Sequence, residues 1–245
     1  MPGTTRVNPW GTRSTDVRDV TVRARRSMSA HSHYAGSVTA ERGVFIAFEG
    51  GEGAGKSSRA RALAGRLRAA GREVVLTHEP GDTRIGRQVR HLVLDVSTGD
   101  LDVRAEALLY AADRAEHVAE LVGPALAGGA VVVTDRYVDS SIAYQGIGRG
   151  LGAETVARLS EFATGGQVPD LTVVLDVPAH IGRNRIRGPE DRLEREPDEF
   201  HERVRQAYLD LAAAQPGRYL VVDATLSAEH VDAIVLDRVK ELGLP

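Results

Sequence analysis

Short apolar runs recur along most of the chain, and none shows the apolar–polar alternation typical of a half-buried strand. The runs cover residues 44–48, 74–77, 131–134, 171–177 and 219–222. The segments between them are long enough to form helices. Strands that are apolar on both faces and alternate with helices are typical of a parallel sheet covered on both sides. The pattern therefore predicts an α/β protein with a doubly wound, five-stranded parallel sheet.

Charged residues follow three of these runs directly. Glu49 follows the first run, Glu79 follows the second after His78, and Asp135 and Arg136 follow the third. Ligands of doubly wound sheets bind at the carboxyl ends of the strands. We therefore expect these side chains to lie around one ligand site.

Two segments depart from the strand and helix pattern. Residues 1–42 are rich in Arg, Ser, Thr and Gly and lack hydrophobic periodicity, which predicts a disordered extension. A true start at Met28, or a transit peptide, would account for the same composition. Residues 183–196 are dense in Arg and acidic residues and contain a Gly-Pro pair, which favours a mobile lid over a packed helix. The rest of the chain, 43–245, is predicted to form one domain that carries this lid.

Composition narrows the classes of function. The formal net charge is −3 and aromatic residues make up 4% of the chain, so neither a basic field nor a stacking platform for a nucleic-acid polymer is indicated. The chain has no cysteine, which excludes disulfides and thiolate catalysis and fits a reducing compartment. No apolar run approaches the roughly 18 residues that a membrane-spanning helix needs. We expect a soluble cytoplasmic protein that binds neither a membrane nor a nucleic-acid polymer.

The stretch between residues 50 and 58 has the G-x-x-x-x-G-K-[ST] pattern of a phosphate-binding loop, or P-loop. It consists of Gly50, Gly51, Glu52, Gly53, Ala54, Gly55, Lys56, Ser57 and Ser58. The glycines let backbone N–H groups face a phosphate, the Lys reaches the outer phosphates, and the first Ser can bind Mg²⁺. Lys56 is one of only two lysines, the other being Lys240, and an ammonium is the compact point charge that suits phosphate. The stretch predicts a site for a nucleoside triphosphate.

Three further residues could each have either a binding role or an ordinary structural role, judged from spacing alone. Asp135 stands where a carboxylate could hold Mg²⁺ or its waters opposite the P-loop, but an Asp at a strand end also caps helices. Arg114 and Arg136 each follow an Asp, and guanidinium groups suit bidentate capture of phosphate. In a chain this rich in arginine, however, a given arginine is more often a solvated surface residue, so spacing alone does not select these two.

A series of motifs decides between these readings. In chain order they are the P-loop, Glu79-Pro80-Gly81, and residues 109–114 (LYAADR), 135–141 (DRYVDSS) and 143–146 (AYQG). In this order and at these strand ends they closely resemble the bacterial thymidylate kinases, over residues 43–240. The resemblance implies a P-loop nucleoside-monophosphate-kinase-like fold that uses ATP and Mg²⁺ to convert dTMP to dTDP, on the way to dTTP. It also implies a homodimer built from helices packed face to face.

The same resemblance implies roles at the phosphate end of the site. It puts Asp135 and Ser57 at the metal, partly through water, and Arg136 on the acceptor phosphate. Arg114 matches an arginine on the base side that also approaches this phosphate. Glu52 matches an acid near the sugar 3′-hydroxyl.

Roles at the base end are also implied by the resemblance. Tyr110 matches an aromatic residue that stacks on thymine, and Arg90 matches an arginine that reaches a base carbonyl. Ser141 and Gln145 match polar groups that read the pyrimidine edge, and Tyr144 matches the residue under the deoxyribose. An aromatic face, a guanidinium and an amide are also what a flat base with carbonyl and imide edges requires.

Positive charge for the transferring phosphoryl group is expected from the lid. One branch of the family carries an Arg in the P-loop where this chain has Gly53, whereas the predicted lid holds Arg183, Arg185, Arg187 and Arg192. We expect Arg187 and Arg192 to be catalytic and Arg183 and Arg185 to bind ATP. Lid closure would bring this charge in as water leaves.

Two positions depart from the family pattern R-E-P-G-G. His78 stands in place of the Arg, and Asp82 stands in place of the second Gly. A histidine carries less positive charge than an arginine near neutral pH, so a positive contact at position 78 is expected to be weaker. Glu79 keeps its motif position and is expected to bind substrate.

The predicted reaction is phosphoryl transfer by positioning and electrostatics, with no covalent enzyme intermediate. The alternatives are another small-molecule P-loop kinase, a GTPase-like switch and a non-enzymatic nucleotide-binding scaffold. The switch would need an N-K-x-D motif, and neither Asn8 nor Asn184, the only two asparagines, has that context. The motifs that match the binding site of the acceptor nucleotide argue against a different kinase. A kinase assay would distinguish an enzyme from a non-enzymatic scaffold.

Overall fold

Five parallel strands form one sheet in the order β2-β3-β1-β4-β5 in a computed structural model, which describes residues 42–245. The strands are β1 (Phe45–Glu49), β2 (Val74–His78), β3 (Val131–Asp135), β4 (Leu171–Asp176) and β5 (Tyr219–Asp223). The predicted doubly wound sheet is confirmed, and its strand ends differ from the predicted ones by one residue at most. Residues 1–41 lie outside the described range, so the disordered extension over 1–42 stays a prediction.

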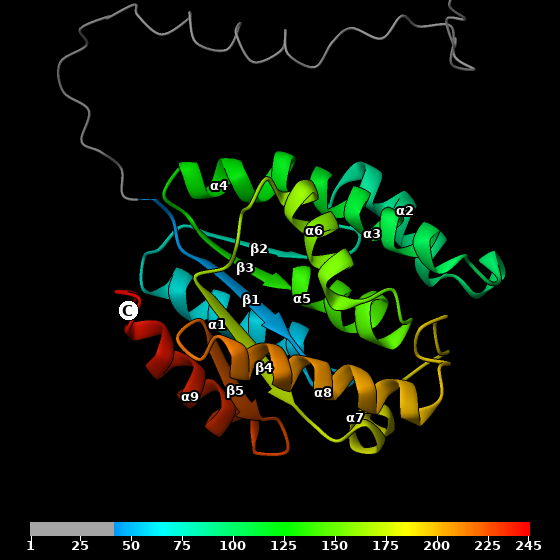
Figure 1. The fold of residues 1–245 in the computed structure, drawn as a ribbon. Helices are drawn as coiled ribbons and strands as arrows, with labels where there is room; N and C mark the ends of the chain where they lie inside the picture. The colour runs from blue at the N-terminus through cyan, green and yellow to red at the C-terminus, as the bar shows by residue number, and fades with distance from the viewer. Residues whose placement is uncertain (1–41) are drawn as a thin grey trace, which may run out of the picture. The chain divides into compact units, whose positions relative to one another are not determined.

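Helices connect the strands and cover both faces of the sheet (Figure 1). They are α1 (Lys56–Ala69), α2 (Arg84–Leu94), α3 (Val103–His117), α4 (Gly123–Ala127), α5 (Val138–Ser141), α6 (Ala153–Thr164), α7 (Ala179–Arg185), α8 (Asp198–Ala214) and α9 (Ala228–Lys240). Short 3₁₀ and π-helical segments complete them, namely η3 (Val96–Thr98), η4 (Val118–Val122) and η5 (Ile142–Gly148). Helices α1 and α9 pack on one face of the sheet, and α4 and α8 pack on the other.

The central strand β1 contributes side chains to both cores. Ile46 and Phe48 are buried among residues of α1 and α9, whereas Phe45 and Ala47 are buried with residues of η4 and α4. A strand that is covered on both faces needs apolar residues at every position, because each side chain leaves water. This explains why the sequence of the strand shows no polar alternation.

Strand register brings the charged strand ends to one edge of the sheet. Phe48 lies opposite Asp135, which in turn lies opposite His78. The Glu79 amide then donates to the Asp135 carbonyl over 3.0 Å, and the Arg136 amide donates to the Phe48 carbonyl over 2.9 Å. The predicted gathering of these residues at the carboxyl ends of β1, β2 and β3 is confirmed.

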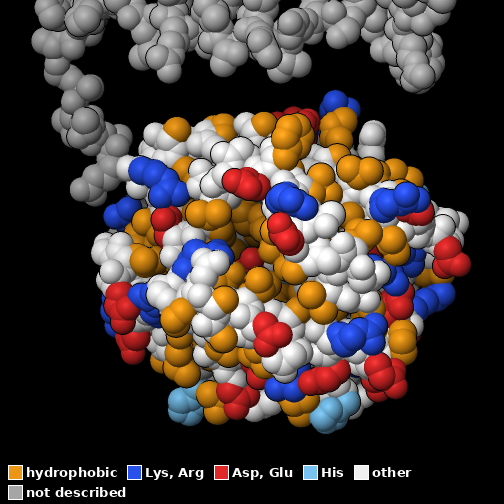
Figure 2. Space-filling view, in the orientation of Figure 1, with side chains coloured by type: hydrophobic (Ala, Val, Ile, Leu, Met, Phe, Trp, Pro, Cys, Tyr) orange, Lys and Arg blue, Asp and Glu red, His pale blue; other side chains and the backbone are white. Residues whose placement is uncertain are grey.

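The surface carries charges of both signs. On the face drawn in Figure 2, Lys and Arg side chains are interspersed with Asp and Glu, and no broad basic patch is present on that face. Among residues 42–245, no helix is both long and apolar enough to cross a bilayer.

Candidate functional site

The P-loop turns sharply between β1 and α1 because its glycines adopt conformations that other residues avoid. Gly50, Gly53 and Gly55 have φ values of 134°, 67° and 92°. A Cβ atom at Gly53 would also lie 1.9 Å from the carbonyl oxygen of Gly182, on α7. A larger side chain at position 53 would therefore require α7 to move. The close approach therefore disfavours an arginine at position 53.

Lys56 begins α1 and is 7% exposed. Its Nζ donates to the carbonyl oxygens of Gly50 and Gly51 over 3.1 and 2.7 Å, so the ammonium is held over the loop. Burial, and next the Arg136 charge, lower the pKa of Lys56. A bound polyphosphate would oppose both effects, because it adds negative charge beside the ammonium.

Ser57 and Asp135 meet across the loop with oxygen donors suited to a hard cation. The Ser57 hydroxyl donates to Oδ2 of Asp135, while Oδ1 of Asp135 is buried and has no hydrogen-bond partner within the described chain. Mg²⁺ takes oxygen ligands and is held in phosphate-transferring enzymes by one or two protein groups together with phosphates and waters. The unpartnered carboxylate oxygen of Asp135 fits such an ion. Among residues 42–245 there is no cluster of three His, Cys, Asp or Glu side chains that could hold a metal ion.

Arg136 is the one residue of the described chain other than glycine with a positive φ, at 71°. Such a backbone costs about 1–2 kcal/mol and is found where surrounding contacts enforce it. The guanidinium forms an ion pair with Glu52, donates to the Ser140 hydroxyl over 3.0 Å, and lies 5.1 Å from the centre of the Tyr144 ring. The strained turn thus aims Arg136 across the mouth of the P-loop.

Glu52 reaches out of the P-loop toward Arg136 and the Tyr144 hydroxyl, which donates to it over 2.8 Å. Burial by itself raises the pKa of the Glu52 carboxyl, but the charges of Arg136 and Lys56 outweigh it and bring the pKa to about 2. Glu52 is therefore ionised at neutral pH and accepts hydrogen bonds only.

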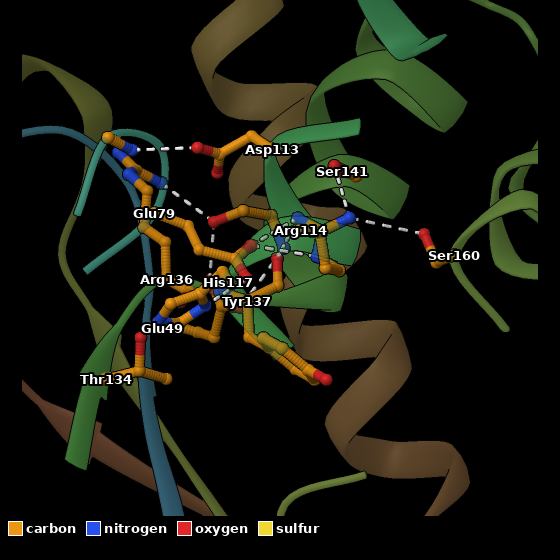
Figure 3. A network of polar contacts seen from close by, with 12 residues as sticks. Glu49, Glu79, Asp113, Arg114, His117, Thr134, Arg136, Tyr137, Ser141 and Ser160 are labelled. Carbon is orange, nitrogen blue, oxygen red and sulfur yellow. Dashed lines mark hydrogen bonds and ion pairs between the residues drawn. The ribbon is translucent and has the colours of Figure 1, made fainter. Parts of the chain in front are cut away.

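A buried charged network lies at the carboxyl ends of β2 and β3 (Figure 3). Arg114, on α3, and Glu79 are each 2% exposed and form an ion pair at 2.8 Å. The opposite oxygen of Glu79 hydrogen bonds to Nδ1 of His117 over 2.8 Å. Arg114 also donates to the Ser141 hydroxyl over 3.2 Å and to the Tyr137 carbonyl over 3.0 Å. The network ties the ends of β2 and β3 to α3 and α5.

The turn that follows Glu79 holds both departures from the family pattern. Nδ1 of His78 lies 3.8 Å from the Asp82 carboxylate, which also accepts the Thr77 hydroxyl over 2.6 Å. The Gly81 amide donates to Asp113 over 3.0 Å. The two departures therefore face each other, and Asp82 has a local partner in place of the glycine of the family motif.

One cavity of about 900 Å³ extends from the P-loop to Tyr110 and Gln145. The predicted residues that line it are Glu52, Gly53, Gly55, Lys56, Ser57, Ser58, Glu79, Arg90, Tyr110, Arg114, Asp135, Arg136, Ser141, Tyr144, Gln145 and Arg185. Gly50, Gly51 and Ala54 complete the loop behind this lining. One end of this cavity is thus formed by the P-loop, and the other end carries an aromatic ring and a side-chain amide.

The predicted lid arginines are spread over several partners. Arg183 pairs with Asp198 and Glu190, and Arg185 donates to the Ala224 carbonyl over 2.9 Å. Both arginines lie in the last turn of α7. The first three residues of the predicted lid 183–196 are therefore helical, and only 186–196 lie outside helices.

The other two predicted lid arginines lie beyond α7. Arg187 is exposed and forms no side-chain hydrogen bond or ion pair with residues 42–245. Arg192 donates to the Val93 carbonyl over 3.0 Å and forms an ion pair with Glu106. Arg192 is thus held against α2 and α3 in this structure.

Two buried acids support the site, of which sequence reasoning placed Glu49 at a strand end and missed Glu106. Glu49 accepts the Tyr137 amide over 2.8 Å and the Ser140 hydroxyl over 2.6 Å, beneath Arg136. Glu106 lies four residues before Tyr110 on α3, so both side chains face the same side of the helix. A charged residue on the face that carries Tyr110 is the signal that would have found Glu106.

Comparisons with known proteins agree with this geometry. Residues 48–235 match the family profile described as thymidylate kinase. The chain is 52% identical over 200 residues to a thymidylate kinase of Cutibacterium acnes, covering 82% of this chain and 98% of that one. It is 49% identical over 204 residues to a thymidylate kinase of Bifidobacterium longum, covering 82% and 99% of the two chains.

A solved structure adds the fold to these sequence matches. The thymidylate kinase of Ehrlichia chaffeensis superposes with a TM-score of 0.65 at 31% identity, covering 82% of this chain and 99% of that one. The resemblance read from the motifs is confirmed by the family profile, by the sequence relatives and by this structure. The chain belongs to the thymidylate kinase family.

Proposed function

We propose that this thymidylate kinase transfers the γ-phosphate of ATP to the 5′-phosphate of dTMP inside the large cavity, giving ADP and dTDP. The observation that carries the proposal is that one cavity joins Lys56 and the P-loop to Tyr110 and Gln145. The acceptor is already an anion, so the reaction needs alignment and charge neutralisation more than a strong base.

The phosphate end supplies fixed positive groups. When ATP binds, the Lys56 ammonium releases its hydrogen bonds to the two loop carbonyls and donates to the β- and γ-phosphates instead. The backbone N–H groups of the loop donate further hydrogen bonds to these phosphates. Arg136 faces the same space and holds the acceptor phosphate, with Glu52 fixing the direction of its guanidinium. These groups are oriented before the ligands arrive, which is the basis of electrostatic catalysis.

Mg²⁺ fits this end of the cavity because Ser57 and Asp135 offer oxygen ligands. When bound, the ion neutralises charge on the phosphates. Asp135, with its unpartnered Oδ1, and Ser57, with its hydroxyl, would hold the ion.

The base end recognises a pyrimidine. Tyr110 offers an aromatic face, Arg90 a guanidinium fixed to the Pro80 carbonyl at 2.8 Å, and Gln145 an amide. Ser141 is held by Arg114, and Tyr144 lies beside Glu52 where the deoxyribose would sit.

A steady-state kinase assay over nucleoside monophosphates tests this function. We expect kcat/KM to fall in the order dTMP, dUMP, then dCMP and AMP. The single methyl group that dUMP lacks is worth about 1–3 kcal/mol, or roughly 10- to 200-fold. Cytosine brings an amino donor toward Arg90 in place of the thymine O4 acceptor, which leaves the guanidinium without that partner. Equal rates with dCMP or AMP would overturn the choice of substrate and leave the kinase chemistry standing.

The lid arginines act mainly in the transition state in this proposal. Arg187→Ala should lower kcat by at least about tenfold and change the KM for dTMP by less than about threefold, since Arg187 reaches the phosphates only on closure. Arg195→Ala is the matched control, because it removes an exposed arginine from the same segment that we do not assign to the site. Unchanged kcat with a raised KM would move Arg187 to the acceptor site.

The protein acts as a homodimer in this proposal. Leu108 on α3 is 58% exposed and Phe162 on α6 is 88% exposed, and these two helices pack against each other. Large apolar side chains at such exposure favour an interface. Sedimentation equilibrium that finds only monomer at micromolar concentration would contradict it.

We also assign the protein to the cytoplasm, where a chain without cysteine loses nothing to the reducing conditions. Cell fractionation that finds the protein in another compartment would refute this assignment.

A further inference from the structure

Glu106 is a buried carboxylate behind Gln145, a residue of the cavity lining, and donors from two other segments reach it. It lies on α3 and is 1% exposed. Nε2 of Gln145 donates to Oε1 of Glu106 over 2.9 Å, and Nε of Arg149 donates to the same oxygen over 3.3 Å. Arg192 donates to Oε2. One carboxylate therefore joins α3, the end of η5 and the segment after α7.

The surroundings of Glu106 keep it ionised. Burial by itself raises the pKa of this carboxyl, but the hydrogen bond from Gln145 and the guanidinium groups of Arg192 and Arg149 outweigh it and lower the pKa. An ionised carboxylate accepts hydrogen bonds and donates none. The Gln145 side chain must therefore turn its NH₂ group toward Glu106. The orientation of a side-chain amide is fixed by its partners, and here the partner permits only one.

The carbonyl oxygen of Gln145 is left for a ligand. Gln145 lines the cavity together with Tyr110 and Arg90. The only side-chain hydrogen bond of Gln145 within residues 42–245 is the one from Nε2 to Glu106, and Oε1 is not among the buried atoms that lack a partner. Oε1 is thus an acceptor at the cavity end where the base is expected.

We propose that Glu106 is a positioning residue for base selection, which presents the carbonyl oxygen of Gln145 to the base by holding its NH₂ group. The inference rests on the proposed function, in which Gln145 reads the pyrimidine edge. Thymine and uracil carry an N3–H group that this oxygen accepts. Cytosine carries an unprotonated N3, so two acceptors would face each other without a proton between them.

The substitution Glu106→Gln tests this role. Arg149 and Arg192 attract the new carbonyl oxygen, so the new NH₂ group is left toward Gln145, which then turns its own NH₂ group to the base. We expect the ratio of kcat/KM for dTMP to that for dCMP to fall by about 10- to 100-fold, with a raised KM for dTMP and a lowered KM for dCMP. If Glu106 had a purely structural role, its loss would lower kcat/KM for dTMP and for dCMP by the same factor. An unchanged ratio of the two values in folded E106Q overturns the proposal.

Glu196→Gln is the matched control, because Glu196 is the other carboxylate paired with Arg149 and does not contact Gln145. It should leave the dTMP-to-dCMP ratio unchanged, and a ratio that falls as far as in E106Q would overturn the proposal.

If E106Q does not fold, the double exchange E106Q/Q145E carries the test, since it keeps one carboxylate and one amide beside the same two arginines. A carboxylate at position 145 is again an acceptor, so we expect the preference for dTMP to return to near the wild-type ratio, and its loss overturns the proposal. A wild-type protein that does not phosphorylate dTMP contradicts the proposed function instead.

Discussion

Replacing Lys56 by alanine should abolish turnover. Lys56 is the one lysine in the P-loop, and its ammonium is held over that loop by two backbone carbonyls. Removing one preorganised charge contact to a transferring group typically costs about 10²- to 10³-fold in kcat. We expect a loss of at least this size in a steady-state assay with ATP and dTMP.

The chain provides a matched control for this variant. Lys240, the other lysine, is exposed at the end of α9 and pairs with Asp237. Lys240→Ala should keep wild-type activity, and circular dichroism should show that both variants are folded. Activity of folded K56A within a few fold of the wild type would refute the role of the P-loop in phosphate binding.

Replacing Arg114 by methionine should strongly destabilise the fold. Arg114 and Glu79 are each 2% exposed, so loss of the guanidinium leaves the Glu79 carboxylate buried with His117 alone. Breaking one side of a buried ion pair costs about 3–5 kcal/mol. Urea unfolding at pH 7 should show this loss in the free energy of unfolding.

The pH dependence of R114M follows from the pKa of Glu79. Burial raises this pKa, but Arg114 and His117 outweigh it and hold the pKa below its ordinary value. Wild-type Glu79 therefore contributes stability above the unfolded pKa of about 4.5, and this contribution is lost as pH falls through the folded pKa. The deficit of R114M should accordingly be larger at pH 7 than at pH 4.

Two further variants check the cause of this deficit. The double variant R114M/E79Q removes the stranded charge and should recover part of the stability. Arg104→Met breaks a fully exposed pair with Asp102 and should leave the unfolding curve unchanged. A stability of R114M equal to that of the wild type would show that the buried network does not stabilise the fold.

Local features of the sequence predicted the sheet and the P-loop. The apolar runs are strands because central strands are covered on both faces, and the loop glycines carry the positive φ values that the motif requires. The order of charged strand ends then places Asp135, Arg136 and Glu79 at one edge without further information.

Contacts between distant segments were not predictable in the same way. Arg192 lies 86 residues from Glu106 in sequence, and only the packing of α3 against the segment after α7 brings the two together. The burial of Arg114 likewise depends on α3, α5 and α6 enclosing it, since Ser160 also lies beside its guanidinium at 3.4 Å. A motif shows that such an arginine is present, and only the fold shows which carboxylate it meets.

A crystal structure of the protein with dTMP, Mg²⁺ and a non-hydrolysable ATP analogue tests the central claim most directly. The account predicts the analogue's phosphates in the P-loop at Lys56, the thymine between Tyr110 and Gln145, and the 5′-phosphate of dTMP at Arg136. The reacting atoms should lie about 3–3.5 Å apart, as in a near-attack geometry. A dTMP molecule bound outside this cavity, or with its base in the P-loop, would contradict the account.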